Sequence, residues 1–500
     1  NVGGSFTDMR SDAMTVRGPI ADGSKPFEGE QVGLTNYFAI QNLSTSKTKH
    51  MQEGWREQTQ SIFASAEVGY KSTYYLTLTG RNDWPSQLGG PKSVSKSFFY
   101  PSVGLSVVLS ELIPNLNKEY LSYMKIRGSF ASVGTAFKRY IANPRFEWNE
   151  STGQWSVLTQ YPMYNLKPER TKSFELGLNM RFLNHFELDV TYYNAKTMNQ
   201  TFNPELSVNK YSKIYIQTGA VRNQGVELSL NYKNTWKDFT WDTGLTYSMN
   251  RNKILTLADN AVNPETGEHF SIKTLNMGGL GSTRFILKEG GSMGDIYSLM
   301  DLRKDANGAV YIDENNSVHT QSIQDADKYI KLGSVLPKGN LAWRNNFMWR
   351  NFNVGFMLSA RLGGVVFSRT QAMLDNYGVS EVSAAARDLG YVSVNGNDKV
   401  APENWYSVVA GDTTVPQYYT YSATNVRLQE ASIGYTFPRK MLGNICDIKV
   451  SLVGRNLWMI YNKAPFDPET VASTDNFYQG IDYFMMPSLR NIGFNLSFKF

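Results

Sequence analysis

The sequence has little of several residue types on which familiar protein classes depend. A single cysteine, Cys446, stands among 500 residues, which excludes a disulfide framework and a multi-cysteine metal site. The four histidines are scattered, and no two stand at the spacing of metal ligands. Mean hydropathy is −0.37. No run approaches the roughly 20 apolar residues that a membrane-spanning helix needs, which excludes a helical membrane bundle.

The net charge and the composition exclude further classes of protein. The formal net charge of +6 is too small for a nucleic-acid surface, so no nucleic-acid partner is expected. Aromatic residues reach 13%, and with plentiful aliphatic residues they exclude a disordered chain. Glycine is frequent at 41 residues and tyrosine at 29, a mixture that favours a β protein with many turns.

Apolar and polar side chains alternate from end to end of the chain, which predicts strands with one apolar and one polar face. A switch of parity near Gln429 and Glu430 predicts a β-bulge. The segment 380–389 predicts a short helix within a loop. The expected strands lie within 2–16 and near 60–70, 73–80, 100–110, 123–132, 173–183, 186–194, 222–233, 239–250, 340–350, 352–361, 425–437, 446–456 and 490–500.

The gaps between these strands alternate in length. The short gaps are 71–72, 111–122, 184–185, 234–238, 351 and 438–445. The long gaps are 81–99, 133–172, 195–221, 251–339, 362–424 and 457–489. An up-and-down meander places alternate connections at opposite ends, so one end has tight turns and the other has large loops. Transmembrane β-barrels have this asymmetry, with the long loops outside the cell.

A soluble β-sandwich also alternates polar and apolar faces, so alternation alone leaves both classes open. Aromatic residues gather at both ends of the expected strands, as they do at the two membrane interfaces. About 14 strands would enclose a lumen too wide for side chains to fill. Polar residues of the other face, namely Glu175, Asp189, Glu227 and Asp242, would then meet water. The predicted fold class is all-β, a transmembrane antiparallel up-and-down β-barrel.

Seven stretches carry a family resemblance. They are YPSVGLS at 100–106, KIRGSFASVG at 125–134, LKPERTKSFELGL at 166–178, RNQGVELSL at 222–230, SLVGRNLW at 451–458, APFDPE at 464–469 and GIDYFMMPSLRNIGFNLSFKF at 480–500. In the sequence of these stretches and in their order along the chain, it resembles the C-terminal barrel portion of SusC/RagA-like TonB-dependent outer-membrane transporters. The resemblance implies that residues 1–500 form part of a 22-stranded barrel, without the plug domain that fills it.

The resemblance also implies function and partners. We expect import of a large nutrient, a glycan or an oligopeptide, across the outer membrane of a Gram-negative bacterium. A SusD-like surface lipoprotein would serve as the lid, and the TonB–ExbB–ExbD system would act through the missing plug region. Outer-membrane lipid and the barrel-assembly machinery are further expected partners, and the transporter–lid pair is expected to dimerise. The last strand would carry the assembly signal, in Phe494, Leu496, Phe498 and Phe500.

Aromatic side chains in the long loops are the candidates for contact with substrate or lid, because flat rings stack on sugars and cover peptide side chains. They are Trp148, Trp155, Trp405, Tyr406, Tyr418, Tyr419 and Tyr421. The alternative is that these rings pack the loops against one another. We expect no catalytic, cofactor-binding or metal-binding residue, and therefore no enzyme.

Two motifs have weak claims to other chemistry. Residues 290–294 match G-x-S-x-G by letter, but no clear helix follows, so a glycine-rich loop is expected. Asp305, Asn307 and Glu314 overlay part of an EF-hand loop, but Arg303 stands where the first carboxylate is required. Two functional alternatives stay open: a soluble secreted carbohydrate-binding or carbohydrate-cleaving β protein, and a passive porin.

Overall fold

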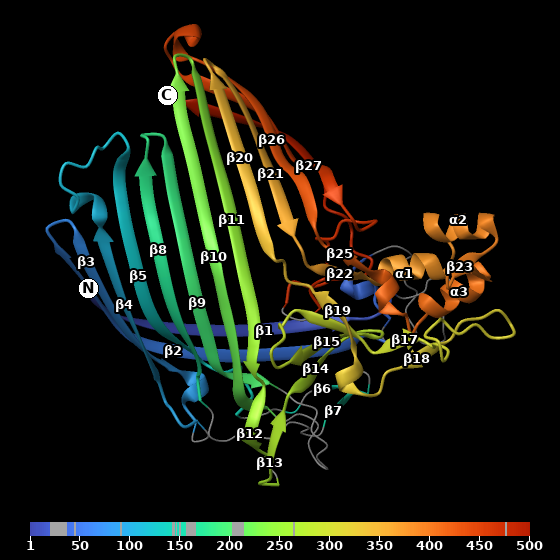
Figure 1. Ribbon diagram of the computed structural model, residues 1–500. Coiled ribbons are helices and arrows are strands. Elements are labelled where there is room, and N and C mark those ends of the chain that lie inside the picture. The colour runs from blue at the N-terminus through green and yellow to red at the C-terminus, as the bar shows by residue number, and fades with distance from the viewer. Residues whose placement is uncertain are drawn as a thin grey trace.

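A computed structural model shows how the strands are arranged (Figure 1). It describes residues 1–20, 38–44, 47–90, 93–142, 146, 148–149, 152–156, 167–202, 215–263, 266–475 and 478–500. Parts of the predicted loops 133–172 and 195–221 lie outside the described residues. Among those described, no helix is both long and apolar enough to cross a membrane.

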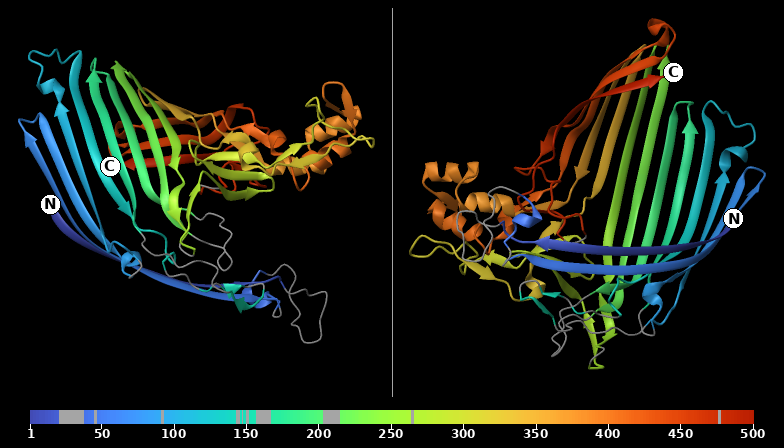
Figure 2. Two further views of the ribbon diagram at one scale, coloured as in Figure 1. Left: turned by 60° about the horizontal axis from the view of Figure 1, so that its bottom comes forward. Right: turned by 180° about the vertical axis from the view of Figure 1, so that it is seen from behind.

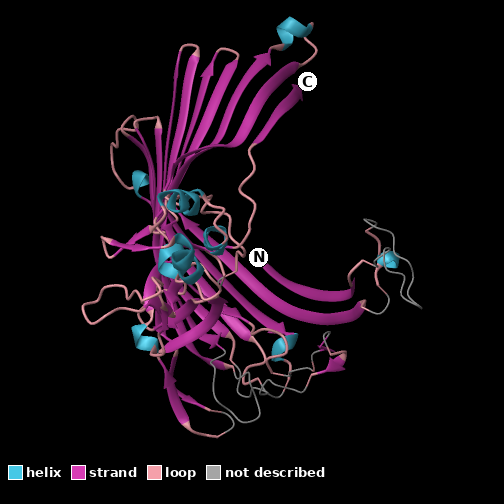
Figure 3. Ribbon diagram, turned by 90° about the vertical axis from the view of Figure 1, so that its right-hand side faces the viewer, coloured by secondary structure: helices cyan, strands magenta, loops and turns pink. Residues whose placement is uncertain are grey.

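Fourteen strands form one antiparallel sheet in which each strand pairs with the next along the sheet. They are β1 (Val2–Arg17), β2 (Lys49–Tyr70), β3 (Tyr74–Pro85), β4 (Phe98–Val108), β5 (Leu121–Thr135), β8 (Glu169–Phe182), β9 (Phe186–Phe202), β10 (Ile216–Trp236), β11 (Phe239–Thr256), β20 (Gly339–Trp349), β21 (Phe352–Leu362), β26 (Asn425–Phe437), β27 (Asp447–Asn462) and β29 (Asn491–Lys499). Within the described residues the sheet is open, and it curls into a trough with β1 and β29 at its edges (Figures 2 and 3). Every predicted strand is present.

The alternation of side chains continues from strand to strand because the register keeps like residues opposite each other. One row of cross-strand partners is apolar: Ile126, Leu178, Val190, Leu228, Tyr247, Leu341 and Ala360. The next row is mainly polar: Arg127, Gly177, Thr191, Glu227, Ser248, Asn340, Arg361, Asn425 and Asn462. Apolar side chains such as Leu176, Val354 and Leu452 are exposed rather than covered by a second layer. The apolar face is therefore the outer face of the sheet.

Aromatic rings cluster beside the tight turns, as predicted. Phe182 stacks on Phe186 with ring centroids 5.1 Å apart, and Phe186 lies 4.8 Å from Tyr232. Phe352 and Tyr435 continue the series at 4.8 Å. Rings of this kind prefer the boundary between hydrocarbon and water. They mark one edge of the apolar band.

The predicted β-bulge is confirmed in β26. The register of this strand shifts between Leu428 and Glu430 against both of its neighbours, β21 and β27. Against β21, Gln429 is the extra residue, whereas on the other side it lies opposite two unpaired residues of β27, Asn456 and Leu457. The bulge lies near the beginning of β26, where it reorients the side chains that precede it.

Several strands extend beyond their predicted limits at the long-loop end. For example, β2 begins at Lys49 rather than near 60, and β9 runs to Phe202 rather than 194. Above the apolar band both faces of a strand meet water, so the alternation that marks a strand in the sequence disappears although backbone pairing continues.

The long loops fold into small sheets and short helices at one end of the trough. The strands are β6 (Trp148–Asn149), β7 (Gln154–Trp155), β12 (Ala258–Val262), β13 (His269–Ile272), β14 (Thr274–Leu280), β15 (Thr283–Lys288), β16 (Asp295–Ser298), β17 (Met300–Leu302), β18 (Thr320–Ser322), β19 (Ile330–Ser334), β22 (Val365–Ser368), β23 (Val392–Val394), β24 (Asp398–Val400), β25 (Thr420–Ser422) and β28 (Ile481–Asp482). The α-helices are α1 (Arg369–Asn376), α2 (Glu381–Leu389) and α3 (Pro402–Val409). Single 3-10 turns lie in connections at both ends of the trough: η1 (Ile40–Asn42), η2 (Ser86–Leu88), η4 (Ala326–Lys328) and η5 (Pro416–Tyr419) in long loops, and η3 (Leu109–Glu111) and η6 (Arg439–Leu442) at the tight-turn end.

The short helix predicted over 380–389 is confirmed as α2. Ser380 begins it by accepting a hydrogen bond from the backbone N–H of Ser383, and Gly390 ends it in the left-handed conformation. The neighbouring helices α1 and α3 have no counterpart in the prediction. Together the three helices cover a core that contains Phe285, Phe367 and Ile481.

Candidate functional site

A hollow of about 710 Å³ lies on the polar face of the sheet. Its lining comes from strands β5, β9, β10, β11, β20 and β21, together with Glu469 from the loop after β27, and β8 between β5 and β9 contributes none. Because these strands present their polar side chains to it, this face is the inner one. We call it the lumen hollow. Its charged lining residues are Arg127, Asp189, Glu227, Arg361 and Glu469.

On the inner face of the sheet, several charged and polar side chains in and beside the lumen hollow bond to one another. The Nη2 atom of Arg127 lies 3.0 Å from an oxygen of Asp189 and 2.7 Å from the hydroxyl of Thr191. Asn179 joins the same network by bonding to both Arg127 and Asp189. Asp242, on β11, pairs with Arg344 at 2.9 Å. These contacts agree with the prediction that Asp189 and Asp242 belong to a water-facing lining.

A second hollow, of about 810 Å³, lies next to the first at the long-loop end, and we call it the mouth hollow. Its wall combines the end of β11 with residues of the loops 257–338 and 363–424. Gly363 and Gly364 turn the chain at its rim with φ of +73° and +85°, a conformation that favours glycine. A Cβ atom on Gly364 would lie 3.3 Å from two backbone carbonyl oxygens, so the rim also requires the small residue.

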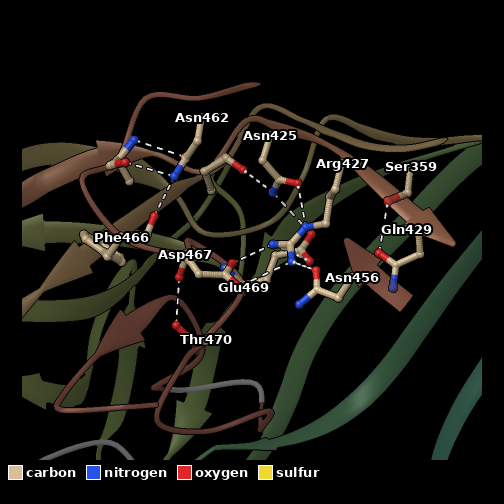
Figure 4. A network of polar contacts seen from close by, with 12 residues as sticks. Ser359, Asn425, Arg427, Gln429, Asn456, Asn462, Phe466, Asp467, Glu469 and Thr470 are labelled. Carbon is tan, nitrogen blue, oxygen red and sulfur yellow. Dashed lines mark hydrogen bonds and ion pairs between the residues drawn. The ribbon is translucent and has the colours of Figure 1, made fainter. Parts of the chain in front are cut away.

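A buried arginine attaches the loop 463–490 to the barrel wall (Figure 4). Arg427, on β26, donates through Nη2 to Asp467 at 2.5 Å and to Glu469 at 3.0 Å. Its Nη1 donates to the side-chain oxygen of Asn456 at 3.1 Å. The Arg427 side chain is only 4% exposed and that of Asp467 is 10% exposed. We call this group the Arg427 anchor.

The anchor explains the APFDPE stretch, which the sequence singled out only as a resemblance. Asn462, at the end of β27, donates to the backbone oxygens of Ala464 and Phe466 and so shapes the turn that brings Asp467 inward. Glu469 of the same stretch accepts from Asn425 at 3.3 Å and lines the lumen hollow. The anchor therefore fixes one wall of the candidate site.

Three of the predicted aromatic contact residues are core residues. Trp405, Tyr406 and Tyr419 are 9%, 8% and 2% exposed within the packed loop region. Tyr419 donates its hydroxyl to the buried Asp375 at 3.1 Å. Their surroundings favour the alternative that these rings pack the loops together, and their contact with substrate or lid stays a prediction.

The other four lie at the surface or beside a hollow. Trp148 and Trp155 face each other across the β6–β7 hairpin, 5.3 Å apart, and are exposed. Tyr418 packs edge-on against Trp405 and is 45% exposed. Tyr421 lines the mouth hollow, where burial raises the pKa of its hydroxyl to about 12 and so keeps it a neutral donor. Among the seven predicted aromatic contact residues, all of which the structure describes, Tyr421 is thus the one that borders a hollow.

The assembly-signal residues and the two weak motifs lie on an edge strand and in turns. Phe494, Leu496, Phe498 and Phe500 are exposed along the edge strand β29 and just beyond it. Ser292 of the G-x-S-x-G match precedes strand β16 rather than a helix, so the elbow geometry is absent there. Asp305 accepts from the backbone N–H groups of Asn307 and Ala309 and so closes a tight turn.

The anchor predicts a pH dependence. Burial raises the pKa of Asp467, but hydrogen bonds led by that from Arg427 outweigh it and leave the pKa below its ordinary value of 3.8. A carboxyl shifted in this direction stabilises the fold above its unfolded pKa, and the contribution is lost as pH falls through the folded value. We expect hydrogen exchange of 463–475, corrected for intrinsic rates, to be steady between about pH 7 and 5 and to rise only below about pH 4.

The variant D467N is the control for this experiment, because it removes the titrating group but keeps the shape. Its exchange should be faster at neutral pH and should lack the rise below pH 4. An increase in the natural protein already between pH 7 and 5 would contradict the assignment.

Comparison with known families decides what kind of barrel this is. The family model described as "TonB dependent receptor-like, beta-barrel" matches residues 22–457. The chain belongs to the TonB-dependent receptor β-barrel family. It is therefore a protein of the outer membrane of a Gram-negative bacterium. The structure and the family together confirm the predicted fold class and localisation.

Individual relatives indicate the SusC/RagA-like members of this family. TonB-dependent receptor P3 of Formosa agariphila is 25% identical over 523 residues, covering 95% of this chain and 49% of the relative. TonB-dependent receptor SusC of Bacteroides thetaiotaomicron is 25% identical over 296 residues, covering 55% of this chain and 26% of the relative. The RagAB peptide importer in its open-open state matches all of this chain and 52% of its own at a TM-score of 0.73 and 17% identity, a likeness of fold. The resemblance to SusC/RagA-like transporters is confirmed. The chain spans about half the length of P3 and of a second relative from Formosa agariphila, TonB-dependent receptor P26.

Proposed function

We propose that this chain is the barrel wall of an importer that carries a large nutrient, a glycan or an oligopeptide, across the outer membrane with energy from TonB. The observation that carries the proposal is the pair of polar hollows on the inner face of a TonB-receptor barrel. The lumen hollow lies between the strands, and the mouth hollow adjoins it among the long loops. In this proposal residues 1–500 supply 14 strands of a 22-stranded barrel, and the plug lies outside them.

The proposal includes a SusD-like lipoprotein as a lid. The loop region exposes apolar side chains at the end of α1 and on α2, where Tyr377, Val379 and Val382 are 71%, 68% and 60% exposed. Clustered apolar side chains at a surface are typical of protein contacts. The matches to SusC and to the RagAB importer support a lid of this class.

Uptake by living cells tests the import function. In the native bacterium, the gene would be deleted and then restored on a plasmid, and uptake of fluorescent oligosaccharides and oligopeptides would be measured with and without functional TonB. We expect deletion and TonB inactivation to abolish uptake of the same class of compound. Uptake that persists without TonB would instead indicate a passive porin, and a protein found in the supernatant without detergent would indicate the soluble alternative.

Labelling of single cysteines tests the orientation. In a C446S background, N397C lies in the turn between β23 and β24, and K440C lies in η6 at the tight-turn end. Both positions are exposed. We expect a membrane-impermeant maleimide to label N397C and not K440C on intact cells, and to label both after lysis. Labelling of K440C alone on intact cells would mean that the topology is reversed.

A further inference from the structure

The mouth hollow carries charge of a single sign. Its charged lining residues are Arg251, Lys331 and Lys338, and its lining includes no carboxylate. Lys331 is paired with Asp295 at 2.5 Å. Arg251 and Lys338 are exposed, and no ion-pair partner is seen for either among the residues that the structure describes. Two cations therefore face this hollow without a counter-charge.

The uncharged part of the lining is rich in amides and hydroxyls. Asn250, Asn252 and Gln417 supply amides, and Ser292, Ser334, Thr420, Ser422 and Thr424 supply hydroxyls. Gln417 donates through Nε2 to the backbone oxygen of Met300 at 2.9 Å, but its Oε1 is buried without a hydrogen-bond partner. A buried acceptor left unpaired costs free energy, so the Gln417 amide has unused capacity for a hydrogen bond.

The mouth hollow leads to the lumen hollow along the same strands. On β11 the lining passes from Asn250 to Ser248, and on β20 it passes from Lys338, just before the strand, to Asn340. At the end of β21 it passes from Gly363, just after the strand, to Arg361 within it.

At that junction Arg361 donates through Nη2 to the backbone oxygen of Val335 at 2.7 Å, while its Nε is buried without a partner. A third cation thus stands where the two hollows meet.

We propose that the mouth hollow binds an acidic oligosaccharide, with sugar carboxylates facing Arg251 and Lys338 and sugar hydroxyls bonded to the surrounding amides and hydroxyls. The inference rests on the import function proposed above and specifies its substrate class. Carboxylates form charge-assisted hydrogen bonds with Arg and Lys. A peptide is less well matched, because its ammonium terminus would need a carboxylate that this lining does not supply. The ring of Tyr421, held edge-on by Phe466 at 5.6 Å, offers a flat surface for a sugar.

Binding to the purified protein tests this inference. The full-length protein in detergent would be titrated calorimetrically with three size-matched probes: tetragalacturonate, the neutral tetragalactose and tetraglutamate. We expect tetragalacturonate to bind at least about tenfold more tightly than tetragalactose, a difference equivalent to about 1.4 kcal/mol. Raising the salt concentration from about 50 to 500 mM should weaken it markedly, since exposed charges are screened.

Substitutions assign the effect to the hollow. The double variant R251Q/K338Q should weaken tetragalacturonate binding at least about tenfold, because it removes both charged hydrogen-bond donors. K338R should retain binding. K273Q removes an exposed lysine of the same loop region that lies outside both hollows, and should have no effect. Heat-modifiable migration on a gel confirms that each variant is folded.

The outcomes separate this inference from the proposed function. Equal binding of the neutral and acidic sugars, or an unchanged affinity in R251Q/K338Q, would overturn the anionic site. Binding of tetraglutamate in preference to tetragalacturonate would overturn the choice of a sugar. TonB-dependent uptake of a neutral compound, together with no binding of tetragalacturonate, would sink the inference and leave the import function standing.

Discussion

Replacing Arg427 with methionine is expected to lower the free energy of unfolding by about 3–5 kcal/mol, because it leaves the buried carboxylate of Asp467 without its cation. Asp467 would keep its 10% exposure but lose the Arg427 guanidinium 2.5 Å away. Guanidinium-induced unfolding in lipid vesicles, monitored by tryptophan emission, measures the loss. Hydrogen exchange of 463–475 should rise at the same time, because the loop is no longer attached to β26.

The matched control lies on neighbouring strands. Arg455 and Glu430 form an ion pair of 3.0 Å between β27 and β26, but their side chains are 68% and 39% exposed. Exposed pairs contribute about 0–1 kcal/mol, so R455Q should change little. Equal losses in R427M and R455Q would mean that burial does not distinguish the two pairs, and the anchor would lose its special role.

Replacing Leu176 with arginine should cost about 2–4 kcal/mol in a lipid bilayer, as a charge does near the middle of a barrel's lipid-facing surface. Leu176 lies on the outer face of β8 and is 48% exposed in the isolated chain. The same charge one residue earlier, in E175R, faces the lumen and should cost little. The measurement is again reversible unfolding in vesicles.

This pair of variants tests the direction of the sheet as well as its stability. If E175R were the more damaging change, the polar face would be the one against lipid. The cost of L176R should also shrink in detergent micelles, whose apolar layer deforms more easily around a charge than a bilayer does.

The strands could be predicted because their signal is local. A strand with lipid on one side and water on the other repeats every two residues, as in 174–182, and the pattern needs no knowledge of distant residues. The ends of β2 and β9 could not be predicted in this way, because above the membrane both faces are wet. The bulge at Gln429 was visible because a single extra residue changes the parity of everything that follows it.

The candidate site could be predicted only in part. Asp189 and Glu227 stood out as polar residues on alternating strands, and both line the lumen hollow. The Arg427 anchor joins residues about 40 positions apart in the sequence, and the lining of the mouth hollow includes both Arg251 and Tyr421. A local sequence pattern cannot predict that such distant residues lie close together. The burial of Trp405 and Tyr419 could not be predicted for the same reason, since only the tertiary structure shows that these aromatic loop residues lie in a core.

That core has a consequence for how the loops can change. Phe285, Phe367 and Ile481 come from three different connections, and β22 of one runs parallel to β28 of another, with Ser368 donating to the buried Asp482 at 2.6 Å. Each of the three connections buries its part of this core against the other two, so none can complete its packing alone. Grafting one of them from a relative into this protein should therefore give a misfolded loop region, whereas exchanging all three together should preserve the core. The three connections are thus expected to change together in evolution rather than one at a time.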